Sequence, residues 1–191
     1  MSTRAFTLIE LLIVVGIIAI LAAIAIPNML EAQVRAKVSR AKSDMRTIAT
    51  ALESYAVDNN KYPPNFDSGL YTPTAPDEGR TFSLLSTPIA YISSVPHDVF
   101  RPDDNEPTRG HFFDYVGWDS VSVLTSRYSP ELRAYYAQTG TQWSVGCIGP
   151  DKRNDDVGQY MDNPYDRIYD PTNGTVSVGD IIRTNVRQLG G

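Results

Sequence analysis

An almost unbroken apolar run near the N-terminus constrains this chain more than any other feature. Residues 6–26 read FTLIELLIVVGIIAILAAIAI. Twenty-one helical residues at about 1.5 Å each extend roughly 31 Å, which matches the ~30 Å hydrocarbon core of a bilayer. Glu10 interrupts the run, and a carboxylate in an inserted helix costs about 2.5–3.5 kcal/mol. The surrounding large apolar residues offset that cost, so the sequence predicts a membrane-spanning helix that carries one acid.

The first of two open interpretations is a secretory signal that is cleaved and removed. Arg4 then supplies the basic start, residues 11–21 the apolar region, and Ala23-Ile24-Ala25 the cleavage site. Such apolar regions are usually free of acids and about 7–15 residues long, which this run exceeds.

In the second interpretation, residues 1–5 are a short basic leader that is cut off after Ala5. Phe6 becomes the new N-terminus and carries a positive amine. Glu10 then lies one helical turn from that amine and near the positive end of the helix dipole. The amine of an adjacent copy is an equally good partner, and such a pair would set the axial register of a polymer.

Residues 5–10, AFTLIE, followed by an apolar helix and Pro27, resemble the processing motif of type IV prepilins and type II secretion pseudopilins. The resemblance implies that a prepilin peptidase cuts between Ala5 and Phe6 and methylates the Phe6 amine. It also implies that Glu10 guides assembly and that Pro27 kinks the helix. Ala5 stands where the family normally has Gly, and because Ala is also small we expect slowed rather than blocked cleavage.

Helical periodicity continues after Pro27 in an amphipathic form, through residues 27–60. Pro27 lacks a backbone donor, which predicts a kink or local melting where the helix leaves the membrane. Asn59-Asn60, ahead of Pro63-Pro64, is a stop signal. The apolar positions recur at steps of three and four, as on one face of a helix: Leu30, Val34, Val38, Ala41, Met45, Ile48, Leu52 and Tyr55.

A basic belt follows the membrane span, and we define it as Arg35, Lys37, Arg40, Lys42 and Arg46, with Asp44 the one acid among them. It is either a solvated face that also meets phospholipid headgroups or a contact for acidic surfaces of neighbouring copies. The whole chain has 17 basic and 22 acidic residues and a formal charge of −5. This balance gives no reason to expect a nucleic-acid partner.

Residues 61–191 change to the composition of a small β-rich domain. Short β-like runs occur between turn signals, and two segments favour short helical turns. A small antiparallel sheet packed on the outer half of the helix would bury both apolar faces, which predicts an α+β, ladle-shaped pilin-like fold. The β-like runs are residues 90–95, 112–118, 142–148, 174–178 and 180–184, and the helical segments are residues 83–87 and 130–138.

Three later stretches resemble the major, G-type pseudopilin. They are residues 51–64 (ALESYAVDNNKYPP), residues 95–100 (VPHDVF) with Asp114-Tyr115 downstream, and residues 144–156 (SVGCIGPDKRNDD). Val99 replaces the second proline of that family's Pro-x-Asp-Pro loop.

The resemblance implies a structural subunit of a type II secretion pseudopilus, a helical filament that is assembled from the inner membrane and drives protein export. The implied partners are further copies, other pseudopilins, the prepilin peptidase, the inner-membrane assembly platform and the membrane itself. The implied topology is a single-pass inner-membrane protein with a periplasmic domain.

Two alternative functions stay open. One is a pilin of a type IV or competence pilus. The other is a membrane-tethered binding domain that uses aromatic side chains, with Trp118, Tyr135, Tyr136 and Trp143 as candidates, although aromatics also favour strand packing. The sequence has no glycine-rich phosphate loop, nucleophile elbow or zinc-protease motif, so no enzymatic activity is expected.

Asp151, Asp155 and Asp156, with Asn154, supply hard oxygen ligands within a short loop, as calcium prefers. The G-type resemblance implies calcium in this loop, while a solvated acidic loop is the other interpretation. Asp170 and Asp180 contribute ligands only if the predicted turn at Asn173-Gly174 folds beside the loop. Cys147 is the one cysteine, so no intramolecular disulfide forms, and we expect it to be a half-buried apolar residue.

Overall fold

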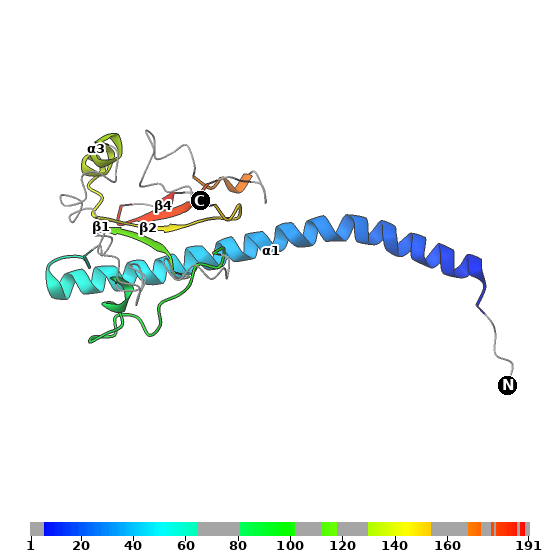
Figure 1. The fold of residues 1–191 in the computed structure, drawn as a ribbon, viewed down its shortest axis with the longest axis horizontal. Coiled ribbons are helices and arrows are strands. Elements are labelled where there is room, and N and C mark those ends of the chain that lie inside the picture. Colours follow the sequence, from blue (N-terminus) through cyan, green and yellow to red (C-terminus); the bar gives the residue numbers. More distant parts are fainter. Residues whose placement is uncertain are drawn as a thin grey trace.

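The computed structural model describes residues 6–64, 81–101, 112–117, 130–153, 168–172, 177, 179–186 and 188–189. One long helix extends far beyond a small domain that is built around its C-terminal half (Figure 1). The predicted α+β ladle is confirmed. In chain order the elements are α1 (Leu8–Asn59), β1 (Asp114–Gly117), α3 (Pro130–Thr139), β2 (Trp143–Cys147), β3 (Ile181–Thr184) and β4 (Gln188–Leu189).

Both ends of α1 are set by local sequence. Thr7 is the N-cap in an extended conformation, and it forms a reciprocal capping box with Glu10. Asn60 ends the helix in the left-handed conformation (φ 54°), which asparagine tolerates better than most residues. The predicted stop at Asn59-Asn60 is therefore confirmed.

The prediction of local melting at Pro27 is wrong. α1 is helical through Pro27 and on both sides of it, and the helix is bent along its length (Figure 1), so the alternative, a kink at Pro27, stays a prediction. Proline deletes a single backbone hydrogen bond, and the intact bonds of the flanking turns keep the helix continuous. The membrane half and the domain half of α1 thus form one rod.

The sheet is antiparallel, with the strand order β1-β2-β3-β4. Tyr115 is opposite Val145, and Val145 is opposite Arg183 on the next strand. The β-like runs at 112–118, 142–148 and 180–184 each contain a strand, as predicted, whereas the short β4 was not expected from the sequence.

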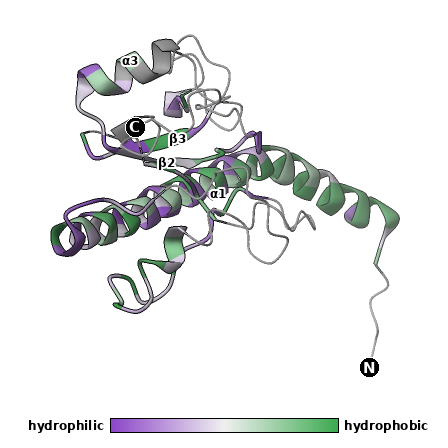
Figure 2. Ribbon diagram, turned by 60° about the vertical axis from the view of Figure 1, so that its left-hand side comes forward, coloured by the Kyte–Doolittle hydropathy of each residue, from purple (hydrophilic) through white to green (hydrophobic). Residues whose placement is uncertain are grey.

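The predicted strand at 90–95 is wrong. The backbone N–H groups of Tyr91 and Ile92 both donate to the carbonyl of Leu85, which closes a loop instead of a ladder. The predicted strand at 174–178 lies mostly outside the described residues. The predicted helical segments are confirmed as a short turn at residues 81–86 and as α3, which lies on the side of the sheet opposite α1 (Figures 1 and 2).

The core forms where one face of α1 meets one face of the sheet. Glu53 ties the two together, because its carboxylate accepts hydrogen bonds from Trp143 Nε1 (3.0 Å) and from the Tyr62 hydroxyl (2.9 Å). The helix residues in this core are Val38, Ala41, Met45, Ile48, Ala49, Ala51 and Leu52, and the sheet contributes Tyr115, Trp143, Val145, Cys147 and Ile181.

Replacing Ile48 with alanine should destabilise the domain. Ile48 is fully buried in the α1–sheet core, and truncating a buried Ile costs about 2–5 kcal/mol through lost contacts and a residual cavity. Urea unfolding of the full chain in detergent, followed by tryptophan fluorescence, measures the loss. Thr47→Ala, one position along on the exposed face, is the matched control, and equal midpoints for the two variants would contradict this packing.

Candidate assembly interface

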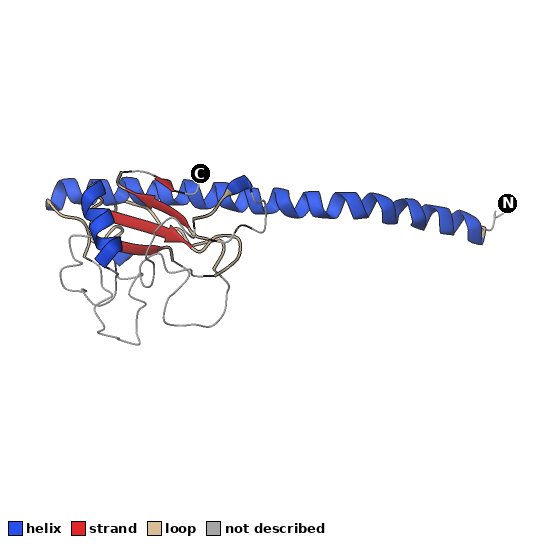
Figure 3. Cartoon of the chain, turned by 90° about the horizontal axis from the view of Figure 1, so that it is seen from above, coloured by secondary structure: helices blue, strands red, loops and turns tan. Residues whose placement is uncertain are grey.

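The N-terminal half of α1 is an apolar surface that its own domain does not cover. Large apolar side chains from Leu8 to Leu30 are between 46% and 80% exposed. The most apolar stretch of the helix has a mean hydropathy of 3.0 and none of it is buried. Figure 3 shows this half projecting beyond the sheet, and Figure 2 shows its apolar character. A surface of this kind requires lipid or other protein around it.

Glu10 lies at the very start of this surface. The backbone N–H and the hydroxyl of Thr7 both donate to Glu10 Oε2, at 2.9 and 2.6 Å, and the Glu10 N–H donates to the Thr7 hydroxyl at 3.3 Å. The carboxylate therefore caps the first turn of its own helix. In this chain the Phe6 nitrogen is still part of a peptide bond, so the pairing of Glu10 with a free Phe6 amine stays a prediction.

The other processing residues are placed only in part. The Phe6 side chain is 71% exposed at the tip of α1, while Ala5 lies outside the described residues. Cleavage between Ala5 and Phe6 also stays a prediction. Pro27 lies inside the continuous helix α1, and its implied role in assembly stays a prediction.

The basic belt surrounds α1 where the apolar surface gives way to the domain. Arg35 pairs with Glu31 at 2.9 Å and Arg40 with Asp44 at 3.7 Å, in both cases one helical turn apart. The Lys42 ammonium lies 5.9 Å from the centre of the Tyr169 ring. Partial burial lowers the pKa of Lys42 from its ordinary value, and the charge of Arg46 lowers it further.

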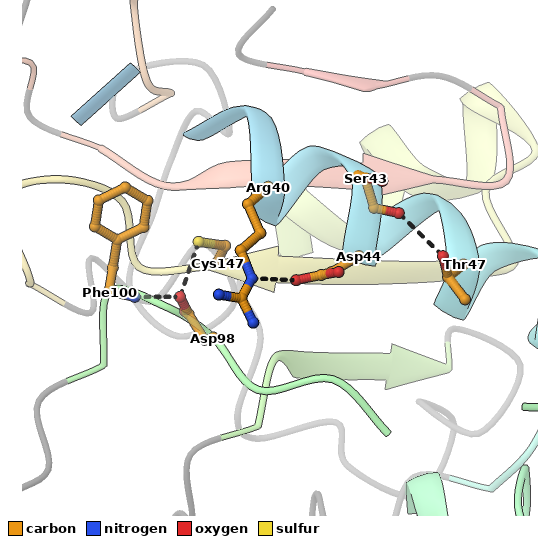
Figure 4. Close-up of polar contacts among 7 residues, drawn as sticks. All are labelled: Arg40, Ser43, Asp44, Thr47, Asp98, Phe100 and Cys147. Carbon is orange, nitrogen blue, oxygen red and sulfur yellow. Dashed lines mark hydrogen bonds and ion pairs between the residues drawn. The ribbon is translucent and has the colours of Figure 1, made fainter. Parts of the chain in front are cut away.

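A buried carboxylate, which the sequence interpretation missed, joins two of the stretches that resembled the G-type subunit. Asp98 Oδ1 accepts hydrogen bonds from the Phe100 N–H (2.9 Å) and from Cys147 Sγ (3.1 Å), and Oδ2 accepts one from the Ile148 N–H (3.0 Å). We call these contacts the Asp98 clamp, and Figure 4 shows those with Phe100 and Cys147 in the same view as the Arg40–Asp44 pair of α1. Asp98 thereby fastens the 95–100 loop to the end of β2, a contact between residues 49 positions apart.

Cys147 is more deeply buried than predicted, with 1% of its surface exposed. Burial raises the pKa of its thiol well above the ordinary value, and the Asp98 carboxylate adds to this effect. The thiol is thus a protonated donor inside the clamp.

The structure describes one of the three predicted calcium ligands, and calcium binding stays a prediction. Asp151 Oδ1 accepts a hydrogen bond from the Arg153 N–H (3.2 Å), and Oδ2 accepts one from the Gly179 N–H (3.4 Å). Asp155 and Asp156 lie outside the described residues. Within the described part of the chain, no group of three or more His, Cys, Asp or Glu side chains is arranged to hold a metal.

The turn before this loop depends on glycine. Gly149 has a φ of 71°, and a Cβ at this position would lie 2.4 Å from the carbonyl oxygen of Gly179. The chain after β2 therefore passes directly against the start of β3. Asp180 is buried there, whereas Asp170 is exposed and accepts hydrogen bonds from the N–H and hydroxyl of Thr172.

Two aromatic candidates for a binding surface are core residues instead. Trp143 and Tyr136 are 1% and 2% exposed, so neither side chain reaches a ligand from outside. Trp118 and the Tyr135 side chain are outside the described parts. The structure gives the tethered-binder alternative no aromatic surface among these described side chains.

Known protein families match both the N-terminal apolar segment and the region that follows it. Residues 28–105 match the family model for type II secretion system (T2SS) protein G, and residues 1–26 match the prokaryotic N-terminal methylation motif. The type II secretion system core protein G of Klebsiella michiganensis is 32% identical over 106 residues, which cover 53% of this chain and 71% of that protein. The chain belongs to the type II secretion system protein G family. Its resemblance to pseudopilins at residues 5–10 and 51–64 is confirmed.

Type IV pilins are also similar to this member of the protein G family. The type IV major pilin protein PilA of Myxococcus xanthus is 33% identical over 142 residues, covering 62% of this chain and 63% of that protein. The type IV wide pilus major component PilA4 of Thermus thermophilus is 47% identical over 89 residues, covering 44% and 66%. The chain thus spans a little under two thirds of the length of these two pilins. No solved structure is significantly similar to it.

Replacing Asp98 with alanine should expose Cys147. Loss of the carboxylate leaves the buried N–H groups of Phe100 and Ile148 without their acceptor, which costs about 1–3 kcal/mol. Local opening then becomes roughly 5- to 150-fold more frequent, and labelling of Cys147 by a thiol reagent at pH 8 should accelerate accordingly. Asp170→Ala, which removes an exposed carboxylate, is the control; similar labelling rates for both variants would show that Asp98 does not hold the loop.

Proposed function

We propose that this chain is a structural subunit of a type II secretion pseudopilus. α1 holds it in the inner membrane until it joins a helical filament that drives protein export. The observation that carries this proposal is the uncovered apolar half of α1, at the end of a rod that carries a folded domain. Membership of the protein G family gives independent support.

During assembly, this apolar surface moves from a lipid environment to contact with the helices of neighbouring copies. In the membrane, lipid surrounds residues 8–30. In the filament, the same side chains pack against α1 helices of neighbouring copies, so the surface never meets water. The domain is fixed to the other half of the rod, and it therefore lies outside the filament core.

Processing prepares the N-terminus for this transfer. In our proposal the leader of residues 1–5 lies in the cytoplasm, and the prepilin peptidase cuts between Ala5 and Phe6 and methylates the new amine. Glu10 then exchanges its capping contacts with Thr7 for the positive amine of an adjacent copy. The match of residues 1–26 to the N-terminal methylation motif supports this sequence of events. The remaining partners are the other pseudopilins and the inner-membrane assembly platform, and the domain faces the periplasm.

A subunit of a type IV pilus is the second candidate, and the similarity to the Myxococcus and Thermus pilins favours it. Both functions use the same helix and the same processing. Deletion of the gene distinguishes them: loss of exported proteins from the medium supports the pseudopilus, and loss of surface pili supports the pilus.

Glu10→Ala should abolish or strongly reduce filament formation, because it removes the acid that sets the axial register. Filaments sheared from cells are counted by electron microscopy, and the membrane fraction is probed for the subunit. The matched control is Glu31→Ala, which removes an acid just beyond the apolar surface and should leave assembly nearly unchanged. N-terminal sequencing of both variants checks that each begins at Phe6.

Normal filaments from Glu10→Ala would remove the role proposed for this acid. A mature protein that begins at Ile26 would instead show a cleaved secretory signal, and the filament proposal would fail with it.

We also propose that calcium binds the loop that contains Asp151, Asp155 and Asp156, on the strength of its acidic composition and of the family resemblance. Calcium should raise the thermal unfolding midpoint of the full chain, and a chelator should reverse the shift, because a ligand that binds only the folded state stabilises it. Magnesium at the same concentration is the control. The absence of any calcium-dependent shift would rule the site out.

A further inference from the structure

The free subunit has a defined depth in the membrane. Residues 11–30 carry no charged side chain, and acids stand at both ends of this interval, at Glu10 and Glu31. These twenty helical residues extend about 30 Å, the thickness of the hydrocarbon core. Because charge inside the core is costly, we expect the free helix to shift a few residues outward from the apolar run of residues 6–26, so that Glu10 lies at one edge of the core and Glu31 at the other.

This depth fixes the height of each member of the basic belt. At about 1.5 Å per residue above Leu30, Arg35 lies roughly 7 Å and Lys37 roughly 10 Å beyond the core. The headgroup layer is about 5–7 Å thick, and long basic side chains reach back toward it along their apolar stems. Arg46, at roughly 24 Å, is beyond the ~8 Å range over which exposed charges act at physiological salt.

The directions in which Arg35 and Lys37 leave α1 fit a surrounding layer of lipid headgroups better than they fit a single protein partner. Each helical residue turns by about 100°, so Arg35 and Lys37 are about 200° apart around α1. Both residues are exposed, so neither direction is blocked by the domain. A flat protein surface contacts one side of a helix, whereas a headgroup layer surrounds it.

We propose that Arg35 and Lys37 bind the phosphate groups of anionic phospholipids in the outer leaflet of the membrane that holds the unassembled subunit. This inference rests on the membrane insertion in the proposed function but not on filament assembly. The Glu31–Arg35 pair does not prevent it, because the Arg35 side chain is 72% and the Glu31 side chain 46% exposed, and such solvent-accessible pairs contribute little stability.

The contact has a consequence for assembly. Each basic residue near an anionic surface contributes about fivefold in affinity, so the lipid layer holds the domain close to the bilayer before the subunit is extracted. Entry into the filament lifts Arg35 and Lys37 away from the headgroups, and their charges then become available to other groups.

The test measures lipid binding to the full chain as an unassembled subunit. The protein in mild detergent micelles is titrated with phosphatidylglycerol or with phosphatidylcholine, and bound lipid is counted by native mass spectrometry. Lys37→Gln should lower the apparent affinity for phosphatidylglycerol about fivefold, and adding Arg35→Gln should lower it further. Phosphatidylcholine binding should not change.

Arg46→Gln is the matched control, since it removes the same charge from the same helix above the headgroup layer. It should change phosphatidylglycerol affinity less than twofold. Equal losses for Lys37→Gln and Arg46→Gln would overturn the proposal, because they would show an effect of net charge alone. Unchanged lipid binding together with lost filaments would assign these residues to a second copy of the chain and would also overturn it. A failure of filament assembly in other variants leaves the lipid measurement valid, so the two proposals fail separately.

Discussion

Everything in this molecule depends on one helix that is too long for its own domain. α1 has 52 residues, about 78 Å at 1.5 Å per residue, and its buried positions begin only at Val38. The described part of the chain leaves most of the apolar side chains before that point exposed, and water is a poor solvent for them. A bilayer and a bundle of identical helices both satisfy such a surface, and the proposed filament subunit would use both in turn.

The C-terminal half of α1 is packed into the core of the domain, which attaches the domain to the helix. Residues from Val38 to Leu52 form one side of the core, Glu53 fastens β2 and the first loop to the helix, and Asp98 fastens a second loop to the end of β2. α1 passes through Pro27 without a break in its helical structure, so no loop separates the membrane half from the domain. In the structure the domain and the membrane half therefore lie on one continuous helix.

The sequence predicted the features that rest on local pattern. Apolar length identified the span, steps of three and four identified the buried face of α1, and Asn59-Asn60 marked its end. Three strands and α3 followed from β-like and helical runs. The errors arose where contacts beyond the local sequence determine the backbone structure. Residues 90–95 have strand-like composition, yet the N–H groups of Tyr91 and Ile92 donate to the Leu85 carbonyl. At Pro27, the hydrogen bonds of the flanking turns keep the helix continuous.

The sequence identified the apolar assembly surface and its acid, but it did not predict the contacts that these residues make. Glu10 stood out because an acid is costly within an apolar run, but its capping contact with Thr7 needs coordinates. The Asp98 clamp left no sequence signal, because Asp98 and Cys147 are brought together only by the fold. The calcium loop remains a prediction, since two of its three proposed ligands lie outside the described residues.

Electron cryomicroscopy of sheared filaments tests the central claim most directly. The account predicts that the filament core consists of α1 helices from neighbouring copies, with residues 8–30 buried against one another and the domains outside. Filaments that lack this chain, or that leave residues 8–30 at the solvent-exposed surface, would contradict it.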